Sequence, residues 1–281
     1  MIPKRYITQW IENAPWPNNA QIEQDLILSR VISEIYSHPF LKEALLFRGG
    51  TALNKLFFKP GLRYSEDIDL VQYSQGPIGD IMTELHSTLD PWLGKPKYKQ
   101  SQGRVTFFYR FATENAPVKT IKVKVEINTR EHGSHLDIKD VPFRVENGWF
   151  STLTSVKTYC LEELMATKLR ALYQRRKGRD LFDLYQVLLS YPTLNISALI
   201  DCFKHYLENE GLQISRAEFE ENMAYKLQDS NFKDDIYPLL SPNLMYDQTK
   251  AYELVYDKII SKLPGEPWGG CQKRVEKTAV E

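Results

Sequence analysis

The spacing of apolar residues predicts an α+β protein with a strand-rich first half and a helical second half. Residues 21–37 repeat apolar side chains every three or four positions, which indicates an amphipathic helix. Residues 118–128 alternate apolar and polar, which indicates a strand with one polar face. We expect a small mixed-sheet core flanked by helices over residues 1–150, a helical domain over residues 151–263 and a flexible tail over residues 264–281. Further strands are expected at 45–47, 64–70 and 104–111, loops or short strands at 137–150, and further helices at 51–58, 80–92, 158–176, 196–210, 215–229 and 250–263.

The bulk composition narrows the functional classes only a little. The chain has 281 residues, enough for one large or two modest domains, and its 36 Lys and Arg residues balance 36 Asp and Glu residues. A net charge of zero gives no global bias toward nucleic acid, although a local basic patch is compatible with it. The three cysteines, Cys160, Cys202 and Cys271, are too far apart for a disulfide framework or a zinc site. We find no signal sequence and no membrane-spanning run, so we expect a cytoplasmic protein.

A glycine turn between an apolar strand end and a helix is the first candidate site. Gly49 and Gly50 follow Phe47 and lead into a segment with helical apolar spacing. Glycines before a helix let a ligand approach the unpaired N–H groups of the helix start, which suits a phosphate. Thr51 adds a hydroxyl, either for the phosphate or as a helix cap. The alternative is an ordinary turn with no ligand.

Two aspartates on the following strand form the second candidate site. In a strand, Asp67 and Asp69 point to the same face, about 6–7 Å apart along the chain. Two like charges beside an apolar segment are unfavourable without a cation between them, and Mg²⁺ prefers such oxygen ligands. A solvated strand end or a fragment of a Ca²⁺ loop is the alternative. The glycine turn followed by the acid pair indicates a functional site more specifically than either motif does alone.

Glu126 is a third candidate carboxylate, on the polar face of the strand over residues 118–128. It shares that face with lysines, including Lys124, so a lysine–glutamate pair on a wet sheet face explains it without function. Strand pairing that brought it beside Asp67 and Asp69 would instead make it a metal ligand. The sequence leaves both interpretations open.

The helical half adds one buried cation and two acids. Lys168 interrupts the apolar stripe of the helix over residues 158–176, where it either extends to solvent or meets a negative partner such as a phosphate. Asp180 is placed to cap the next helix, and Asp183 follows one turn later on the same side. The basic run 174–179 suits a helix C-terminus or the phosphates of RNA.

Together these motifs resemble the AbiEii/AbiGii nucleotidyltransferase toxin family, within the DNA polymerase beta-like nucleotidyltransferase superfamily. The resemblance rests on residues 47–53, 65–70, 125–128, 168–172 and 179–185, in that order. It implies a nucleotidyltransferase core followed by a helical domain. It also implies a bacterial toxin of a toxin–antitoxin or abortive-infection system, paired with an AbiEi-like antitoxin, that transfers a nucleotide from an NTP to an RNA end such as tRNA.

The resemblance also implies roles for individual residues. Gly49, Gly50 and Thr51 would hold the triphosphate. Asp67 and Asp69 would bind Mg²⁺ or Mn²⁺, with Glu126 as the third and most variable ligand. In the helical domain, Lys168 would contact the nucleotide phosphates, and either Asp180 or Asp183 would be the late catalytic aspartate.

Two other functions are compatible with the same residues. The nucleotide acceptor could be a protein hydroxyl instead of an RNA end. The chain could also be a nucleotide- or RNA-binding protein without catalysis, in which the acids are structural. Substitution of the aspartates separates the second alternative from the enzymes.

Overall fold

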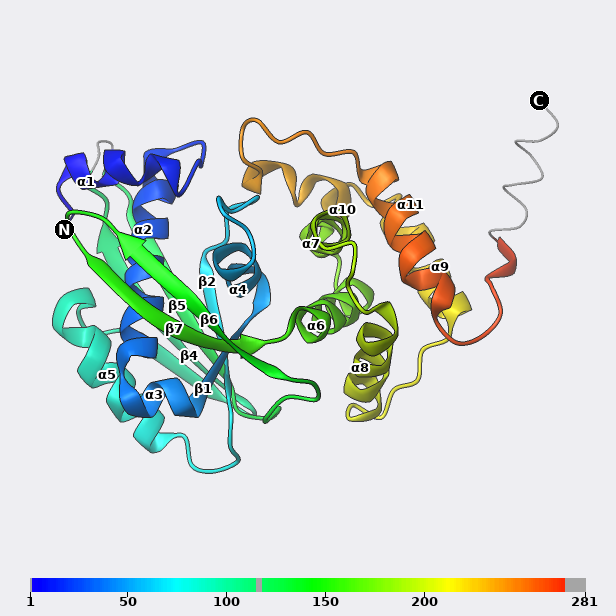
Figure 1. The fold of residues 1–281 in the computed structure, drawn as a ribbon, viewed down its shortest axis with the longest axis horizontal. Helices are drawn as coiled ribbons and strands as arrows, with labels where there is room; N and C mark the ends of the chain where they lie inside the picture. The colour runs from blue at the N-terminus through cyan, green and yellow to red at the C-terminus, as the bar shows by residue number, and fades with distance from the viewer. Residues whose placement is uncertain (1, 115–117, 271–281) are drawn as a thin grey trace. The chain divides into compact units, whose positions relative to one another are not determined.

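A computed structural model describes residues 2–114 and 118–270, and the chain divides into two units (Figure 1). The sheet unit comprises Met1–Cys160 with Leu239–Leu244, and the helical unit comprises Leu161–Pro238 with Met245–Glu281. The division falls after Cys160, at the end of the last strand, whereas the sequence suggested residue 151. Cys271, in the expected tail, lies outside the described residues.

Among the described residues, seven strands form one mixed sheet in the order β3-β4-β5-β2-β1-β7-β6. The central strand β2 pairs antiparallel with β1 and parallel with β5, and β1 pairs parallel with β7. The α+β class and the mixed sheet are therefore confirmed. The strands are β1 (Leu45–Arg48), β2 (Asp67–Gln72), β3 (Lys97–Ser101), β4 (Arg104–Ala112), β5 (Thr120–Asn128), β6 (Ile138–Glu146) and β7 (Ser151–Tyr159).

One face of the sheet builds the core of this unit. Helix α2 packs on β5 and β7, helix α5 packs on β4, and Val125 is fully buried in the cluster that they form. Helix α2 begins after Asn18, whose side chain accepts a hydrogen bond from the N–H of Gln21. The helices of the sheet unit are α1 (Lys4–Gln9), η1 (Trp10–Glu12), α2 (Asn19–Ser37), α3 (Pro39–Ala44), α4 (Gly49–Leu56) and α5 (Gly79–Leu93).

Two features of the sheet differ from the sequence expectation. The segment expected to be loop or short strands, together with the start of the expected helix at 158–176, is a hairpin of two nine-residue strands, β6 and β7. Strand β6 carries Pro142 and pairs only with β7, so it is an edge strand, where proline is tolerated. The polar segment before Arg104 forms β3, every residue of which is exposed. Strand β3 has no apolar alternation, whereas Val141, Phe143 and Val145 alternate along β6 and were the available signal for that strand.

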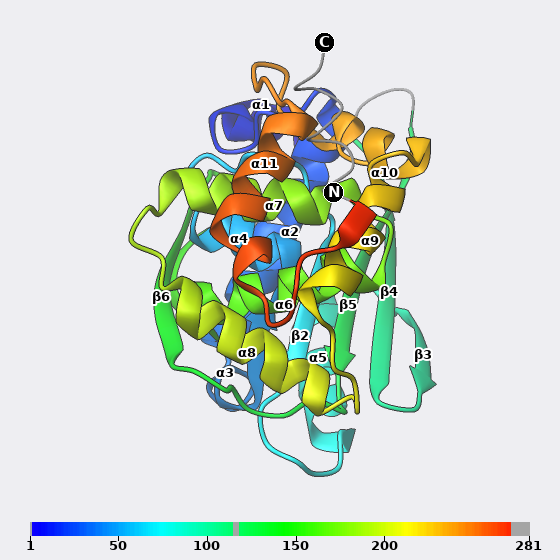
Figure 2. The ribbon, with the colours of Figure 1, turned by 90° about the vertical axis from the view of Figure 1, so that its right-hand side faces the viewer.

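The helical unit is built around α6, which packs against α7 and α8 (Figure 2). Helix α9 begins with a capping box, in which Ser215 and Glu218 satisfy each other's backbone N–H groups. Residues 264–270 were assigned from the sequence to a tail, but the carbonyl of Pro264 accepts a hydrogen bond from the backbone N–H of Arg216, and the backbone N–H of Trp268 donates to the carboxylate of Glu220. The helices are α6 (Leu161–Gln174), α7 (Gly178–Ser190), α8 (Ile196–Glu208), α9 (Arg216–Lys226), α10 (Ser230–Asp234) and α11 (Gln248–Lys258), with the short helices η2 (Tyr237–Leu239) and η3 (Ile260–Lys262).

Candidate functional site

The glycine turn places the start of α4 directly against an aspartate of β2. Helix α4 begins at Gly49, two residues earlier than expected, and no side chain caps it. Gly49 has a φ of 81°, a conformation that favours glycine. A Cβ at Gly49 would lie 2.4 Å from Asp69 Oδ2, so only glycine allows this approach. The predicted glycine turn and the predicted acid pair therefore meet at this point.

The next two residues of the turn are held by the segment before β2. A Cβ at Gly50 would lie 2.3 Å from Arg63 Nη2, so the guanidinium of this buried arginine rests on the helix start. The Thr51 hydroxyl hydrogen-bonds Ser65 Oγ at 2.8 Å and donates to the backbone carbonyl of Asp67. The hydroxyl thus ties α4 to β2, and the N–H groups at the helix start are the donors that remain for an anion.

Strand register places the three predicted carboxylates on one face of two neighbouring strands. Asp67 and Asp69 lie on one face of β2, and Asp69 is the direct neighbour of Glu126 on β5. Burial, and then the charge of Asp67, raise the pKa of Asp69. Lys124 and Arg48 partly oppose this rise, and a further cation beside Asp69 would favour its charged form.

Lys124 already supplies part of that positive charge. Its Nζ lies 3.1 Å from Glu126 Oε2 and 3.5 Å from Asp67 Oδ2. Burial alone would lower the pKa of Lys124, but Asp67 and Glu126 raise it above the ordinary value, so the ammonium stays charged. Glu126 also pairs with Arg104 at 3.5 Å. Glu126 therefore has the lysine partner that its sequence context suggested.

The residues present fit a divalent cation with two protein carboxylates. Within the described ranges, no three His, Cys, Asp or Glu side chains are grouped so as to hold a metal ion. Mg²⁺ in phosphate-transfer sites commonly takes only one or two carboxylates and completes its shell with water and phosphate oxygens. Asp67 and Asp69, with a phosphate at the start of α4, match that donor set.

The helical unit places its three predicted residues in one buried ion cluster. Lys168 Nζ lies 3.2 Å from Asp180 Oδ1 and 2.9 Å from Asp183 Oδ2, and both acids are buried. Arg175 adds two hydrogen bonds to Asp180, at 2.7 and 2.8 Å. Burial opposes ionisation of Asp180, but Lys168 and Arg175 hold its pKa below the ordinary value.

Asp180 does not cap α7, contrary to the sequence expectation. Helix α7 begins at Gly178 after Lys177, so Asp180 lies inside the first turn and its carboxylate is used by the ion cluster. Gly178 is required by packing, because a Cβ there would lie 2.2 Å from the backbone oxygen of Phe232.

The basic run 174–179 has acidic partners at four of its cations. Arg175 pairs with Asp180 and Arg176 with Asp229, while Lys177 and Arg179 both pair with Asp235. These pairs neutralise much of the charge that made the run a candidate for RNA phosphates.

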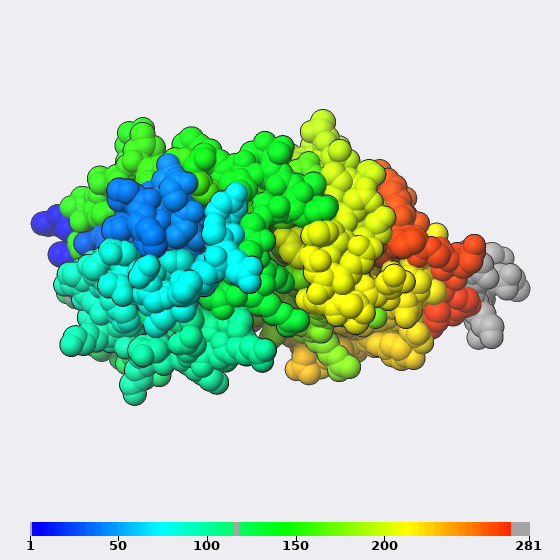
Figure 3. All heavy atoms as spheres, turned by 90° about the horizontal axis from the view of Figure 1, so that it is seen from below, coloured from blue at the N-terminus to red at the C-terminus, as the bar shows by residue number. Residues whose placement is uncertain are grey.

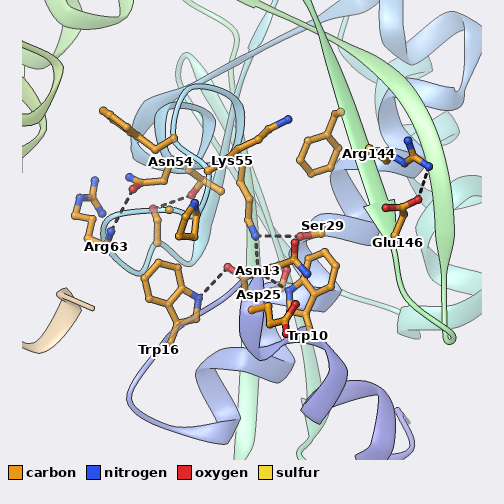
Figure 4. Close-up of a pocket in the computed structure, with 18 residues that line it drawn as sticks. Trp10, Asn13, Trp16, Asp25, Ser29, Asn54, Lys55, Arg63, Arg144 and Glu146 are labelled. Atoms are coloured by element: carbon orange, nitrogen blue, oxygen red, sulfur yellow. Dashed lines mark hydrogen bonds and ion pairs between the residues drawn. The ribbon is translucent and has the colours of Figure 1, made fainter. Parts of the chain in front are cut away.

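A pocket beside α4, lined by both polar and apolar side chains, was not predicted (Figure 4). It has a volume of about 250 Å³, and the indole N–H groups of Trp10 and Trp16 both donate to Asp25, at 2.8 and 3.0 Å. Lys55 also pairs with Asp25 and donates to Ser29 at 3.0 Å. Asp25, three residues after Ile22 and directly before Leu26 of the apolar stripe of α2, was the available sequence signal. Arg63, which contacts the helix start, gave no signal that a single sequence reveals, and Lys124 was expected only as a partner of Glu126.

Comparison with known proteins gives a family match and two similar folds. A family model described as "Nucleotidyl transferase AbiEii toxin, Type IV TA system" matches residues 30–253. The fold is similar to that of MenT4, a nucleotidyltransferase toxin from Mycobacterium tuberculosis H37Rv, with 17% identity, a TM-score of 0.67, and 94% of this chain and 91% of that chain covered. It is also similar to JHP933 from Helicobacter pylori, with 19% identity, a TM-score of 0.53, and 94% and 99% covered.

No curated relative matches this chain. The two solved structures support the fold, while the family match spans most of the sequence and confirms the resemblance seen in the motifs. Among the residues that the structure describes, each helix is too short or too polar to cross a bilayer. The chain belongs to the AbiEii family of nucleotidyltransferase toxins of type IV toxin–antitoxin systems.

Proposed function

We propose that this toxin transfers a nucleotide from an NTP to an RNA end with the help of Mg²⁺ or Mn²⁺, and that tRNA is the acceptor to test first. The approach of Asp69 to Gly49 carries the proposal, because a Cβ at Gly49 would lie 2.4 Å from Asp69 Oδ2. A triphosphate needs N–H donors for its oxygens and a metal for its charge. This contact places the N–H groups at the start of α4 beside a carboxylate that can bind the metal.

Each residue of the sheet unit has a distinct role in this proposal. Asp67 and Asp69 hold the metal, and the N–H groups of Gly49, Gly50 and Thr51 receive phosphate oxygens. When bound, divalent ions stabilise the attacking and leaving oxygens of an in-line displacement at the α-phosphorus. Positioning of the NTP by the helix start supplies much of the remaining rate.

Glu126 can join the metal ligands only when its cationic partners release it. Its Oε2 lies 3.1 Å from Lys124 Nζ and its Oε1 lies 3.5 Å from Arg104 Nη1. We therefore place Glu126 third, after the two aspartates, as a ligand that depends on movement of Lys124.

The roles proposed for the helical unit follow the family resemblance. Lys168 would contact the nucleotide phosphates, and Asp180 or Asp183 would be the late catalytic aspartate. The ammonium of Lys168 is held by both acids in the structure, so its contact with a phosphate requires that it be released from at least one of them. An RNA substrate and an AbiEi-like antitoxin place the toxin in the cytoplasm.

Transfer of labelled nucleotide tests the proposal directly. Full-length protein is incubated with each labelled NTP, Mg²⁺ or Mn²⁺, and total tRNA, alongside Asp69→Asn and Asp140→Asn. Asp140 is an exposed acid on β6 and serves as the matched control. We expect labelled RNA from wild type and Asp140→Asn, and a decrease on the order of 100-fold or more in Asp69→Asn.

Other outcomes of this assay would point elsewhere. Labelled protein without labelled RNA would support transfer to a protein hydroxyl. Growth arrest that survives Asp69→Asn, with no transfer to any acceptor, would support a binding protein without catalysis and overturn the enzyme.

A further inference from the structure

The face of the sheet that carries Asp67 and Asp69 continues outward as a row of cations. Residues paired across neighbouring strands share a face. Asp67 is opposite Lys124 on β5, Lys124 is opposite Phe108 on β4, and Phe108 is opposite Lys97 on β3. The other ladder positions add four more cations to the same face. We call Lys97, Lys99, Arg104, Arg110, Lys122 and Lys124 the cationic face.

The cationic face is open to solvent, whereas the opposite face is core. All of its members are exposed except Lys124, which is partly buried. On the same strands, Val105, Phe107, Val123 and Val125 point the other way and are buried. In Figure 3 the teal segment, which includes β3, forms part of the molecular surface.

Most of the cationic face keeps its charge available. Lys124 and Arg104 are paired with acids, but Lys97, Lys99 and Arg110 have no ion pair within the described part of the chain. Lys122 lies 5.4 Å from the ring centroid of Phe108, a half-buried aromatic on this face. This contrasts with the run 174–179, whose cations have acidic partners.

We propose that the cationic face is the docking surface for the RNA acceptor and leads its end toward Asp67 and Asp69. This proposal rests on the proposed function. The distance from β2 to β3 across the sheet is three strand spacings, about 14 Å. This distance is longer than an NTP triphosphate needs, and it suits several phosphates of a single RNA strand. Cations with an interleaved aromatic are the usual means of holding single-stranded RNA, and Phe108 offers a ring for one base.

Charge reversal at the outer residues tests this surface without requiring catalysis. The variant Lys97→Glu/Lys99→Glu/Arg110→Glu is compared with Lys139→Glu/Lys233→Glu/Lys250→Glu, which changes net charge equally at exposed positions elsewhere. Binding of labelled tRNA and of a single-stranded RNA oligomer is measured by fluorescence anisotropy at several salt concentrations, with the fold checked by circular dichroism. The neutral variant Lys97→Gln/Lys99→Gln/Arg110→Gln replaces the first if charge reversal prevents folding.

We expect the first variant to bind RNA about tenfold more weakly or worse, and its log–log salt slope to fall in magnitude by about 2, since each lost phosphate contact on a single strand accounts for about 0.7. The control triple variant should bind like wild type. Equal weakening in both triple variants, or no weakening in either, would overturn the docking surface even if wild type transfers nucleotide to RNA. Wild type that binds RNA through this face but transfers nothing would instead remove the proposed function. Weakened binding of a protein acceptor alone would also overturn this proposal.

Discussion

Replacement of Lys168 by methionine is the sharpest test of the ion cluster in the helical unit. Methionine keeps most of the side-chain length and removes the charge. The ammonium of Lys168 lies 3.2 Å from Asp180 and 2.9 Å from Asp183, and the side chains of these acids are 0% and 1% exposed. In Lys168→Met, Asp183 would lose its ammonium partner and Asp180 would keep Arg175.

The expected loss of stability follows from removing one partner of a buried ion pair. Such a change costs about 3–5 kcal/mol, because an uncompensated charge stays in a low-dielectric site. Since Arg175 still neutralises Asp180 through two hydrogen bonds, we expect the lower end, about 3 kcal/mol. At roughly 4 °C per kcal/mol for a unit of this size, the melting temperature should fall by about 12 °C.

Differential scanning calorimetry of full-length protein measures this loss, and Lys168→Met/Asp183→Asn is its matched control. The double variant also removes the charge of Asp183, which is the acid that loses its ammonium partner in Lys168→Met. It should therefore recover more than half of the lost stability. The pKa of Asp180 is lowered in the folded protein, so its contribution is present above the unfolded pKa and disappears as pH falls through the lower folded pKa. The gap between wild type and Lys168→Met should therefore shrink below about pH 4. A melting temperature within 2 °C of wild type at pH 7 would refute the buried ion cluster.

Three further predictions concern acids and the glycine turn. The pKa of Asp69 is raised by burial and by Asp67, so any stability that its protonated form contributes is lost as pH rises. The variant Asp69→Asn should therefore raise the melting temperature of metal-free protein at pH 8 and change it little at pH 4. A lower melting temperature at pH 8 would contradict this. Gly49→Ala should weaken Mn²⁺ binding about tenfold in calorimetric titration, because its Cβ would displace Asp69, while Gly79→Ala, with open space around it, should not. Burial opposes ionisation of Asp235, but Arg179 lowers the pKa of this acid to about 2. The variant Asp235→Asn should therefore lower the free energy of unfolding in urea by about 2 kcal/mol at pH 7 and by almost nothing near pH 2. An equal loss at both pH values would argue against the ion pair.

Local sequence patterns were sufficient for the acids and the glycine turn. Alternation in a strand put Asp67 and Asp69 on one face, and the structure keeps that alternation although β2 begins at Asp67, three residues later than expected. Apolar spacing located most of the helices because each buries one stripe, which a single sequence displays directly.

Contacts between distant segments were beyond this reasoning. Nothing near Lys124 in the sequence identifies Asp67 as its neighbour, since parallel pairing of β2 with β5 makes that contact. Asp180 fits the composition of a helix cap, but the partners Lys168 and Arg175 draw its carboxylate into the ion cluster. Local propensity describes what a residue can do, and tertiary partners decide among the options.

The register between β2 and β5 determines the chemistry of the site. Because side chains alternate along a strand, a slip of one residue would bring Val125 opposite Asp67 or Asp69 and turn the cations of β5 into the core. The fully buried Val123, Val125 and Ile127 prevent that slip, since each would then face solvent. The apolar face of β5 therefore does more than stabilise the fold. It keeps Lys124 beside Asp67 and Glu126 beside Asp69, and so fixes the charge pattern on which the metal and RNA proposals both depend.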